Sequence, residues 1–355
     1  MPSPVHAALV GTGFMGAVHA RAITAAGGRV RLVAGSSPDR SRSLADTLPG
    51  AAAADFADVL ASDVDVVHIC TPNHLHHTMA LQAIEAGKHV VCEKPLALTS
   101  AEATELAAAA DRSGLVATVP FVYRFHASVR RARALVAADG HTPWLLHGSY
   151  TQDWLARADH TDWRVDAALG GGSRAFGDIG IHWCDLMEFV TGQRITTLQA
   201  TLGTAHPVRA GHPVTTEDGG VITFRTDAGA LGSLVISQSS AGRKNRLWFS
   251  FDGPDATYTF DQEDPERLWI GGIDGNRVLL RDPAAAGGRP DALPAGHPQG
   301  YRDCFADFVA DTYEAVRGGK PDGLPTFHDG LRAARLTEAV LTSASHHGTW
   351  TEIPE

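Results

Sequence analysis

The chain has 355 residues, which is longer than one ordinary domain and predicts two. Its formal net charge of -10, without long runs of Lys or Arg, argues against nucleic acid or an anionic membrane as a partner and favours a small molecule. Four cysteines without paired spacing, and no apolar stretch near the roughly 20 residues that cross a bilayer, predict a soluble cytoplasmic protein without disulfides or a metal site.

The N-terminal segment predicts a dinucleotide-binding turn. A short apolar strand at 7–10 runs into Gly-x-Gly-x-x-Gly, and a helix is expected at 15–26. In this context Gly11 makes a tight turn, Gly13 lets a pyrophosphate approach the backbone, and Gly16 permits close helix packing. The phosphates are expected at the helix N-terminus. The candidate cofactor contacts here are Gly11, Thr12, Gly13, Phe14, Met15 and Gly16.

The next strand, 30–34, is expected to end beside the adenosine ribose, where an acid selects NAD and a basic residue favours NADP. No acid stands at the strand tip, because Asp39 falls in the following helix, while Arg40 or Arg42 is placed to reach a 2'-phosphate. NAD and NADP both stay open, with a lean to NAD. The candidate cofactor contacts here are Ser36, Ser37 and Arg40.

Two further strands end in polar motifs. The apolar run 64–70 stops at Thr71-Pro72-Asn73, and the helix that follows carries His74, His76 and His77 near its start. These histidines lack a matching cysteine or carboxylate, so a helix start with one residue facing the cofactor is favoured over a metal site. The strand 88–92 ends at Glu93-Lys94-Pro95, at the sheet edge where α/β proteins place their chemistry.

A helix at 100–112 and a strand at 116–120 complete an alternation of strands and helices that predicts a doubly wound parallel sheet. We therefore expect an α/β Rossmann domain over 1–122. A second, α+β domain is expected over 123–355, with a large, mainly antiparallel sheet from 195 to 282 because alternating or β-branched runs recur there between turns. Residues 283–300 are expected to be a surface loop, and the last helix, 329–344, to pack towards the first domain.

Several residues of the second domain are candidates for substrate contact. Tyr123 and Arg124 follow the last parallel strand, although a core tyrosine and an ion-paired arginine are the plain alternatives. A long loop after the strand 144–152 carries Trp154, Trp163 and Arg164, and loops of this length are usually functional or disordered. Tryptophan faces stack against sugar C–H surfaces, but either ring is also compatible with the core.

Asp178 and His182 stand four residues apart on an expected helix, so their side chains share one face. Such a pair is compatible with a structural hydrogen bond or with catalysis. A zinc site from His182, Cys184 and Asp185 is not expected, since residues at this spacing do not converge.

The motifs together resemble the Gfo/Idh/MocA family of oxidoreductases, which includes glucose-fructose oxidoreductase and inositol dehydrogenase. The segment from 152 to 186 is similar to the branch of levoglucosan dehydrogenase and of enzymes that oxidise sugars or glycosides at C3. The resemblance rests on Gly11 to Gly16, Thr71-Pro72-Asn73 with His76, Glu93-Lys94-Pro95, Gly170-Gly171-Gly172, Asp178-Ile179-Gly180-Ile181-His182, Pro325-Thr326, Asp329-Gly330-Leu331 and Glu338-Ala339.

The resemblance implies hydride transfer between a nicotinamide, NAD or NADP, and a secondary alcohol or ketone of a sugar, polyol or glycoside. It implies that His182 is the acid/base, that Lys94 polarises the same oxygen, that Asp178 positions the substrate, and that no metal takes part. It also implies a cis Lys94-Pro95 bond and a homodimer or homotetramer through the antiparallel sheet. The implied cofactor contacts are Thr71, Pro72, Asn73, His76, Glu93 and Lys94, and the implied substrate contacts are Tyr123, Arg124, Trp154, Trp163, Arg164, Asp178 and His182.

Two other functions fit the same fold. A glycosidase or epimerase with tightly bound NAD would reduce and reoxidise its cofactor in each cycle, and a regulator would bind the nucleotide without catalysis. The joint presence of Lys94, Asp178 and His182 argues against the regulator. Net formation of NADH separates a dehydrogenase from the cycling enzyme.

Overall fold

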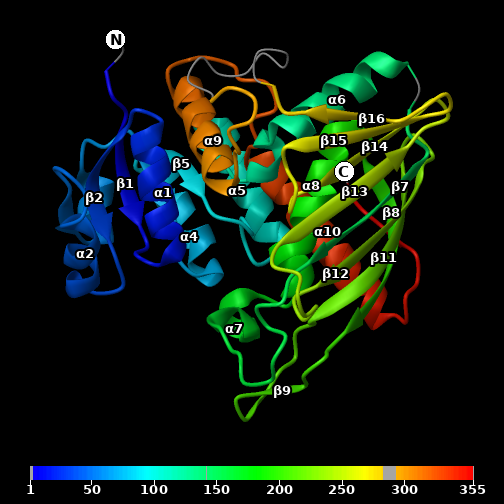
Figure 1. Cartoon of the computed structure of the whole chain (residues 1–355). Coiled ribbons are helices and arrows are strands. Elements are labelled where there is room, and N and C mark those ends of the chain that lie inside the picture. Colours follow the sequence, from blue (N-terminus) through cyan, green and yellow to red (C-terminus); the bar gives the residue numbers. More distant parts are fainter. Residues whose placement is uncertain (1–2, 141, 283–292, 355) are drawn as a thin grey trace. The chain divides into compact units, whose positions relative to one another are not determined.

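The computed structural model describes residues 3–140, 142–282 and 293–354, and the chain divides into two compact units (Figure 1). The first unit contains residues 1–122 and 301–334, and the second contains 123–300 and 335–355. Residues 283–292, the first part of the expected surface loop, lie outside the described residues.

The first unit is built on a six-stranded sheet in the order β3-β2-β1-β4-β5-β6, and all its strands run parallel. The predicted doubly wound parallel sheet is confirmed. Every residue of β4 is buried, as expected for a strand covered on both faces. The strand order changes direction between β1 and β4, which is where such sheets bind ligands. The strands are β1 (His6–Val10), β2 (Arg29–Ala34), β3 (Ala52–Ala54), β4 (Val66–Ile69), β5 (His89–Cys92) and β6 (Ala117–Thr118).

The helices of this unit begin and end where local side chains permit. Thr99 and Glu102 form a capping box at the start of α5, and Gly114 ends that helix in the left-handed conformation. The boundary between the units falls inside the last helix, α10. The helices are α1 (Phe14–Ala25), α2 (Pro38–Ala45), α3 (Phe56–Ala61), η1 (Asn73–Leu75), α4 (His76–Glu85), α5 (Ser100–Ser113), α9 (Tyr301–Val316) and α10 (Phe327–Ser345).

The strand expected at 116–120 is shorter in the structure, because only Ala117 and Thr118 pair with β5. The chain beyond them bonds elsewhere. Thr118 forms an isolated antiparallel bridge with Thr326, and the Val119 amide donates to the Pro325 carbonyl at 3.3 Å. Contacts of this kind join segments about 200 residues apart in sequence, so a local pattern does not contain them.

The second unit contains a nine-stranded sheet in the order β16-β15-β14-β13-β7-β12-β11-β8-β17. Only the β7–β12 pair is parallel, so the predicted mainly antiparallel sheet is confirmed. Its strands are β7 (Leu145–Thr151), β8 (Ile195–Gly203), β11 (Gly219–Thr226), β12 (Leu231–Ser237), β13 (Arg246–Asp252), β14 (Ala256–Asp261), β15 (Arg267–Gly272), β16 (Arg277–Leu280) and β17 (Thr351–Glu352), and β9 (Val208–Arg209) pairs with β10 (His212–Pro213) apart from it.

Helices α6 and α8 cover one face of this sheet (Figure 1). The side chains of strand β12 alternate between the two faces of the sheet. Leu234 and Ile236 point to the helices and are buried, while Leu231 and Val235 point to the other face and are exposed. The uncovered face therefore keeps apolar side chains. The helices of this unit are η2 (Val122–Phe125), α6 (Ala127–Asp139), η3 (Trp163–Val165), α7 (Ala167–Gly170), the π-helix η4 (Phe176–Gly180) and α8 (Ile181–Thr191).

The long loop after β7 is not without structure, since it contains the short helices η3 and α7. Asp162 caps η3 by accepting from the Arg164 amide at 3.0 Å, and Asp166 caps α7 by accepting from the Ala168 amide at 2.9 Å. The two aspartates therefore fold the loop locally.

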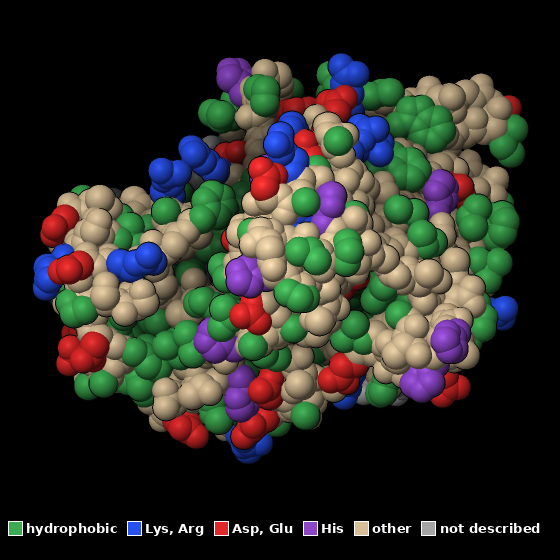
Figure 2. Space-filling model, turned by 90° about the horizontal axis from the view of Figure 1, so that it is seen from below, with side chains coloured by type: hydrophobic (Ala, Val, Ile, Leu, Met, Phe, Trp, Pro, Cys, Tyr) green, Lys and Arg blue, Asp and Glu red, His purple; other side chains and the backbone are tan. Residues whose placement is uncertain are grey.

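The surface mixes charges of both signs. On the face drawn in Figure 2, acidic and basic side chains are scattered among apolar and neutral ones and do not gather into one patch. Among the helices that the structure describes, none has the length and apolarity that a membrane crossing requires.

Candidate active site

The glycine turn after β1 has the geometry that the sequence predicts. Gly11 has φ +110, and a Cβ there would lie 2.4 Å from the Cys70 carbonyl oxygen. A Cβ on Gly16 would lie 2.2 Å from the Gly11 carbonyl oxygen. Both positions therefore require glycine, the first for its backbone angle and the second because α1 packs so closely on the turn.

The residues of this turn fit a dinucleotide. Gly13 is the N-cap of α1, no side chain caps the helix, and its first turn carries no acid. A Cβ added to Gly13 would meet no atom within 4 Å, and the neighbouring Phe14 is 78% exposed. The helix N-terminus thus presents its unbonded N–H groups to open space, with a favourable dipole for a pyrophosphate. Thr12 and Met15, half-buried, flank the turn.

The polar groups after β2 are partly engaged with one another. Ser37 caps α2 by accepting from the Arg40 amide at 3.3 Å, and the Arg42 guanidinium pairs with Asp39. Ser36 and Arg40 are exposed. Asp39 lies in the first turn of α2, as expected, so no acid stands directly at the strand end.

His76 links the two motifs that follow β4 and β5. It has no exposed surface, its Nε2 lies 2.9 Å from the Thr71 carbonyl oxygen, and its Nδ1 lies 2.8 Å from the Pro95 carbonyl oxygen. Burial lowers the pKa of His76 and outweighs the two carbonyls, which act in the opposite direction. The ring therefore ties the loop after β4 to the residue after Lys94. Asn73 is nearly buried beside it, and Pro72 is half-buried.

Lys94 is half-buried at the carboxyl end of β5, and the Lys94-Pro95 bond is cis. The preceding Glu93 is 5% exposed. Its Oε2 accepts from the Lys94 amide at 3.1 Å, and its Oε1 lies 3.0 Å from His19 Nε2. Burial would raise the pKa of Glu93, but His19 and Lys94 outweigh it and hold this pKa below its usual value. Glu93 is therefore a carboxylate inside the domain.

In the second unit, Asp178 lies on the π-helix η4 and His182 on the first turn of α8. A π-helical turn within an α-helix is frequent at functional sites. Asp178 Oδ2 accepts from Gln238 Nε2 at 2.6 Å, and its Oδ1 lies 3.8 Å from Arg164 Nε. Gln238 has no exposed surface, so it holds the carboxylate from the core side.

A buried carboxylate supports the start of this helix. Glu217 accepts from the Ser173 hydroxyl at 2.7 Å, from the Arg174 amide at 3.1 Å and from the Phe176 amide at 2.9 Å. Unbonded N–H groups at a helix start favour such an anion. The sequence reasoning missed Glu217 and Gln238, because both lie on or beside strands far along the chain, with no motif around them.

Two buried arginines share the next carboxylate. Arg174 and Arg209 both pair with Asp218, Arg209 at 2.5 Å, and all three side chains are nearly inaccessible. Arg209 also donates to the Leu155 carbonyl at 2.9 Å. This cluster therefore fastens the loop after β7 to the sheet.

His182 is 6% exposed and lies against tyrosines. The Tyr123 ring meets it edge-on at 4.9 Å between centroids. The Tyr123 and Tyr150 hydroxyls are 2.6 Å apart, and the Tyr150 hydroxyl donates to Asn245 Oδ1 at 2.7 Å. Burial raises the pKa of Tyr123, against the hydrogen bonds that it makes. The sequence reasoning named Tyr123 but missed Tyr150 and Asn245.

The remaining predicted contacts fall into two groups. Arg124 forms a two-point ion pair with Asp185, with Nε 2.8 Å from Oδ2, and its guanidinium lies 5.0 Å from the centre of the Phe189 ring. Arg124 is therefore engaged inside the unit, as the plain alternative of an ion-paired arginine describes. Trp154 and Trp163 are both half-buried.

Both tryptophans connect to the polar groups of the unit. Trp163 stacks under the Arg164 guanidinium at 4.4 Å, and that arginine approaches Asp178. Trp154 Nε1 donates to Gln152 Oε1 at 2.9 Å, and Gln152 donates to Asn245 at 2.7 Å. The structure thus brings Trp163, Arg164 and Asp178 together.

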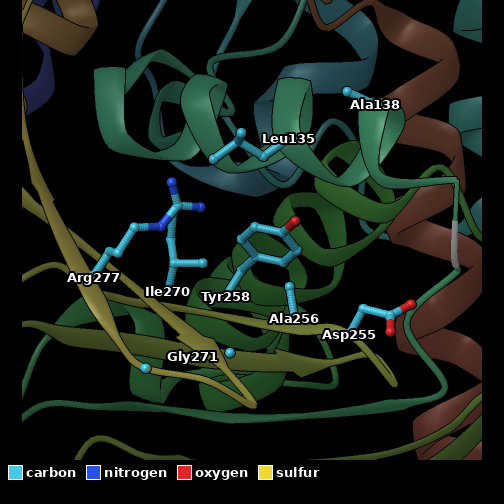
Figure 3. A pocket seen from close by; sticks show the side chains of 10 residues that line it. Leu135, Ala138, Asp255, Ala256, Tyr258, Ile270, Gly271 and Arg277 are labelled. Atoms are coloured by element: carbon cyan, nitrogen blue, oxygen red, sulfur yellow. The ribbon is translucent and has the colours of Figure 1, made fainter.

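A separate hollow of about 310 Å³ lies in the second unit between α6 and strands β14 to β16 (Figure 3). Leu135 and Ala138 line it from the helix, and Tyr258, Ile270 and Arg277 line it from the strands. It shares no residue with the predicted site and contains no histidine or lysine suited to acid–base chemistry. Over residues 3–140, 142–282 and 293–354, no group of three His, Cys, Asp or Glu side chains is arranged to hold a metal ion.

Comparison with known proteins gives consistent matches for both units. The model of the "Oxidoreductase family, NAD-binding Rossmann fold" matches residues 5–121, and that of the "GFO/IDH/MocA C-terminal domain" matches 129–259. Levoglucosan dehydrogenase of Pseudarthrobacter phenanthrenivorans is 29% identical over 82% of this chain and 81% of its own length.

Two solved structures cover the chain almost completely. An oxidoreductase domain protein from Kribbella flavida is 34% identical, covers 100% of both chains and has a TM-score of 0.92. A levoglucosan dehydrogenase in complex with NADH and levoglucosan is 28% identical, covers 99% of this chain and 100% of its own, and has a TM-score of 0.91. The fold described above is therefore that of known oxidoreductases.

The position of His76 yields a first prediction. His76→Phe keeps a ring but removes both nitrogens, so the ring N–H that donates to the carbonyl of Thr71 or Pro95 is lost. We expect a loss of about 1–3 kcal/mol in the free energy of unfolding, measured by urea denaturation, and weaker binding of NADH in a fluorescence titration. The matched control is His77→Phe, since His77 pairs at the surface with Glu105. Equal stability of the two variants would contradict the linking role of His76.

Proposed function

The chain belongs to the Gfo/Idh/MocA family of NAD-binding oxidoreductases, and we propose that it transfers hydride between a nicotinamide and a secondary alcohol or ketone of a sugar, polyol or glycoside. The observation that carries this proposal is the combination of an uncapped, glycine-lined helix start for the dinucleotide with Lys94 at the carboxyl end of β5. Both lie at the edge where parallel sheets bind their ligands.

The relatives support a proposal for the substrate class. Levoglucosan dehydrogenase is similar along most of this chain, and a solved levoglucosan dehydrogenase contains NADH and levoglucosan. We therefore propose a pyranose or pyranoside substrate with a ring hydroxyl as the oxidised group. The half-buried rings of Trp154 and Trp163 suit such a substrate, because aromatic faces pack against the C–H surface of a sugar ring.

We propose NAD as the cofactor. A bound nicotinamide supplies the hydride acceptor in oxidation and the donor in reduction. The residues that would hold the dinucleotide are the glycine turn, the polar ends of β2 and β4 at Ser36, Ser37, Thr71, Pro72 and Asn73, and the start of the Glu93-Lys94-Pro95 motif. Arg42 is engaged by Asp39, which leaves Arg40 as the basic side chain for a 2'-phosphate and keeps NADP a secondary cofactor.

We propose that His182 and Lys94 divide the proton chemistry. Oxidation requires removal of the hydroxyl proton as the hydride leaves carbon, and neutral histidine has a suitable basicity near neutral pH. His182 accepts that proton, and the Lys94 ammonium stabilises the negative charge that develops on the same oxygen. In the reverse direction His182 returns the proton to the carbonyl oxygen.

Asp178 is proposed to position the substrate. Gln238 donates to one of its oxygens, and Arg164 approaches the other, which fixes the carboxylate in place. A carboxylate held in this way accepts hydrogen bonds from sugar hydroxyls. Tyr123 contributes to the proposed site by packing against the His182 ring. Arg124 contributes through its ion pair with Asp185.

We also propose that the uncovered face of the nine-stranded sheet joins two or four copies of the chain. Val221, Leu231 and Val235 on neighbouring strands β11 and β12 are each more than two-fifths exposed, and Val278 and Leu280 continue the exposed apolar residues on β16. Exposed apolar side chains on the uncovered face of a sheet favour an interface.

Lys94 is tested by replacement with an uncharged side chain of similar length. Lys94→Met is expected to bind NADH with wild-type affinity while kcat for sugar oxidation falls by about 10²-fold or more, because the developing negative charge loses its partner. The control is Lys88→Met, which removes a lysine just before the other end of β5. Wild-type kcat in Lys94→Met would remove the lysine from the proposed site.

His182 is tested by the division of the effect between kcat and KM. His182→Ala is expected to lower kcat by about 10²–10⁴-fold, as removal of a general base does. The control is His147→Ala, since His147 on β7 pairs with Asp252. A rise in the KM for the sugar with kcat unchanged would show that His182 binds substrate without transferring a proton.

The interface is tested with a charge in its centre. Val235→Glu is expected to convert the oligomer to a monomer of about 37.5 kDa in light scattering, because two copies would bring carboxylates together in an apolar contact. Val208→Glu is the matched control, since Val208 is 50% exposed on β9, outside the large sheet. An unchanged mass for Val235→Glu would place the interface elsewhere.

A further inference from the structure

Four buried side chains of the first unit form a continuous hydrogen-bonded chain. Glu93 Oε1 lies 3.0 Å from His19 Nε2, His19 Nδ1 lies 2.9 Å from His68 Nδ1, and His68 Nε2 lies 3.0 Å from the Tyr313 hydroxyl. His19, His68 and Tyr313 have no exposed surface. They come from α1, β4 and α9, so the chain crosses the domain core and ends at the residue before Lys94.

The hydrogen-bond geometry fixes where the protons lie. Among the residues that the structure describes, His68 Nε2 is the one hydrogen-bond partner of the Tyr313 hydroxyl. The proton of this buried hydroxyl therefore has an acceptor only when the hydroxyl donates to His68. His68 then carries its proton on Nδ1 and donates to His19 Nδ1. His19 in turn carries its proton on Nε2 and donates to Glu93. With the protons placed in this way, every donor meets an acceptor.

The electrostatics agree with this assignment. Burial holds the pKa of His68 well below its usual value, so that ring stays neutral. The pKa of Glu93 is also below its usual value despite burial, so that group stays ionised. The chain therefore runs in one direction, from the Tyr313 hydroxyl to the Glu93 carboxylate.

The far end of the chain reaches Lys94. The second Glu93 oxygen accepts from the Lys94 backbone amide at 3.1 Å. On the other side, His76 Nδ1 lies 2.8 Å from the Pro95 carbonyl oxygen. The backbone that carries the Lys94 side chain is thus held before and after the residue.

A carboxylate and two imidazoles in a domain core cost free energy that apolar side chains would not. We propose that Tyr313, His68, His19 and Glu93 act as one directed hydrogen-bond chain that positions Lys94. His19 and His68 are then positioning residues. The catalytic meaning of this inference rests on the proposed function of Lys94, whereas the chain itself is observable without turnover.

Glu93→Gln tests the hydrogen-bond chain because glutamine has the shape of glutamate. Its NH2 group reverses the direction in which the hydrogen bonds are donated. The amide oxygen still accepts from the Lys94 amide, but the NH2 group now faces His19. Satisfying every group requires the His19 proton on Nδ1 and the His68 proton on Nε2, donating to the Tyr313 oxygen. Nitrogen-15 NMR of the imidazoles reads which nitrogen carries the proton, and we expect both tautomers to invert.

The same variant reports on Lys94. Its backbone amide resonance is expected to move upfield, because a neutral amide oxygen is a weaker acceptor than a carboxylate. We expect kcat to fall about tenfold with the KM for the sugar within about twofold. The matched control is Glu105→Gln, which neutralises a surface carboxylate 2.8 Å from His77 and leaves the tautomers, the Lys94 amide and kcat unchanged.

Tyr313→Phe is the second variant, in case Glu93→Gln does not fold. It removes the Tyr313 hydroxyl, the first donor, so the His68 Nε2 resonance is expected to shift while His19 keeps its tautomer. We expect a smaller fall in kcat than in Glu93→Gln. Unchanged tautomers in Glu93→Gln, or an unchanged His68 signal in Tyr313→Phe, would show that the four side chains do not form the proposed hydrogen-bond chain. Inverted tautomers with an unchanged Lys94 amide and kcat would overturn the positioning role. Inversion with a shifted amide but no wild-type turnover of any sugar would support the chain and reject the proposed function.

Discussion

The first unit depends on the burial of one carboxylate, Glu93, at the carboxyl end of β5. A buried carboxylate is stable only if it is hydrogen-bonded and faces positive charge. His19 and the Lys94 amide supply the bonds, and Lys94 contributes charge. This requirement explains why a polar side chain stands on the inner side of α1 and why the backbone at Lys94 is held so closely.

Buried polar side chains also hold the start of η4 in the second unit. Glu217 binds the backbone N–H groups before Asp178, while Gln238 binds the Asp178 carboxylate. The two supports lie beside strands of the large sheet, so the sheet positions the helix that carries Asp178 and His182. In both units a proposed reacting group is thus fixed by buried polar partners from distant parts of the sequence.

The sequence predicted those features that rest on local patterns. The glycine turn, the alternation of strands and helices, the mainly antiparallel sheet and the cis bond implied at Lys94-Pro95 all agree with the structure. The partners of Glu93 and Asp178 were not predicted, because a hydrogen bond between residues far apart in sequence leaves no periodicity or spacing. The short length of β6 was not predicted for the same reason, because the end of this strand pairs with a segment near residue 326.

The proposed reaction is net hydride transfer to a nicotinamide from a carbohydrate. The most direct measurement incubates the protein with NAD and a panel of sugars, polyols and glycosides and follows the absorbance of the reduced cofactor. We expect NADH to accumulate in proportion to the oxidised sugar, with pyranoses or pyranosides as the best substrates. Conversion of a glycoside without net NADH would contradict it and indicate a cofactor that is reduced and reoxidised within each cycle.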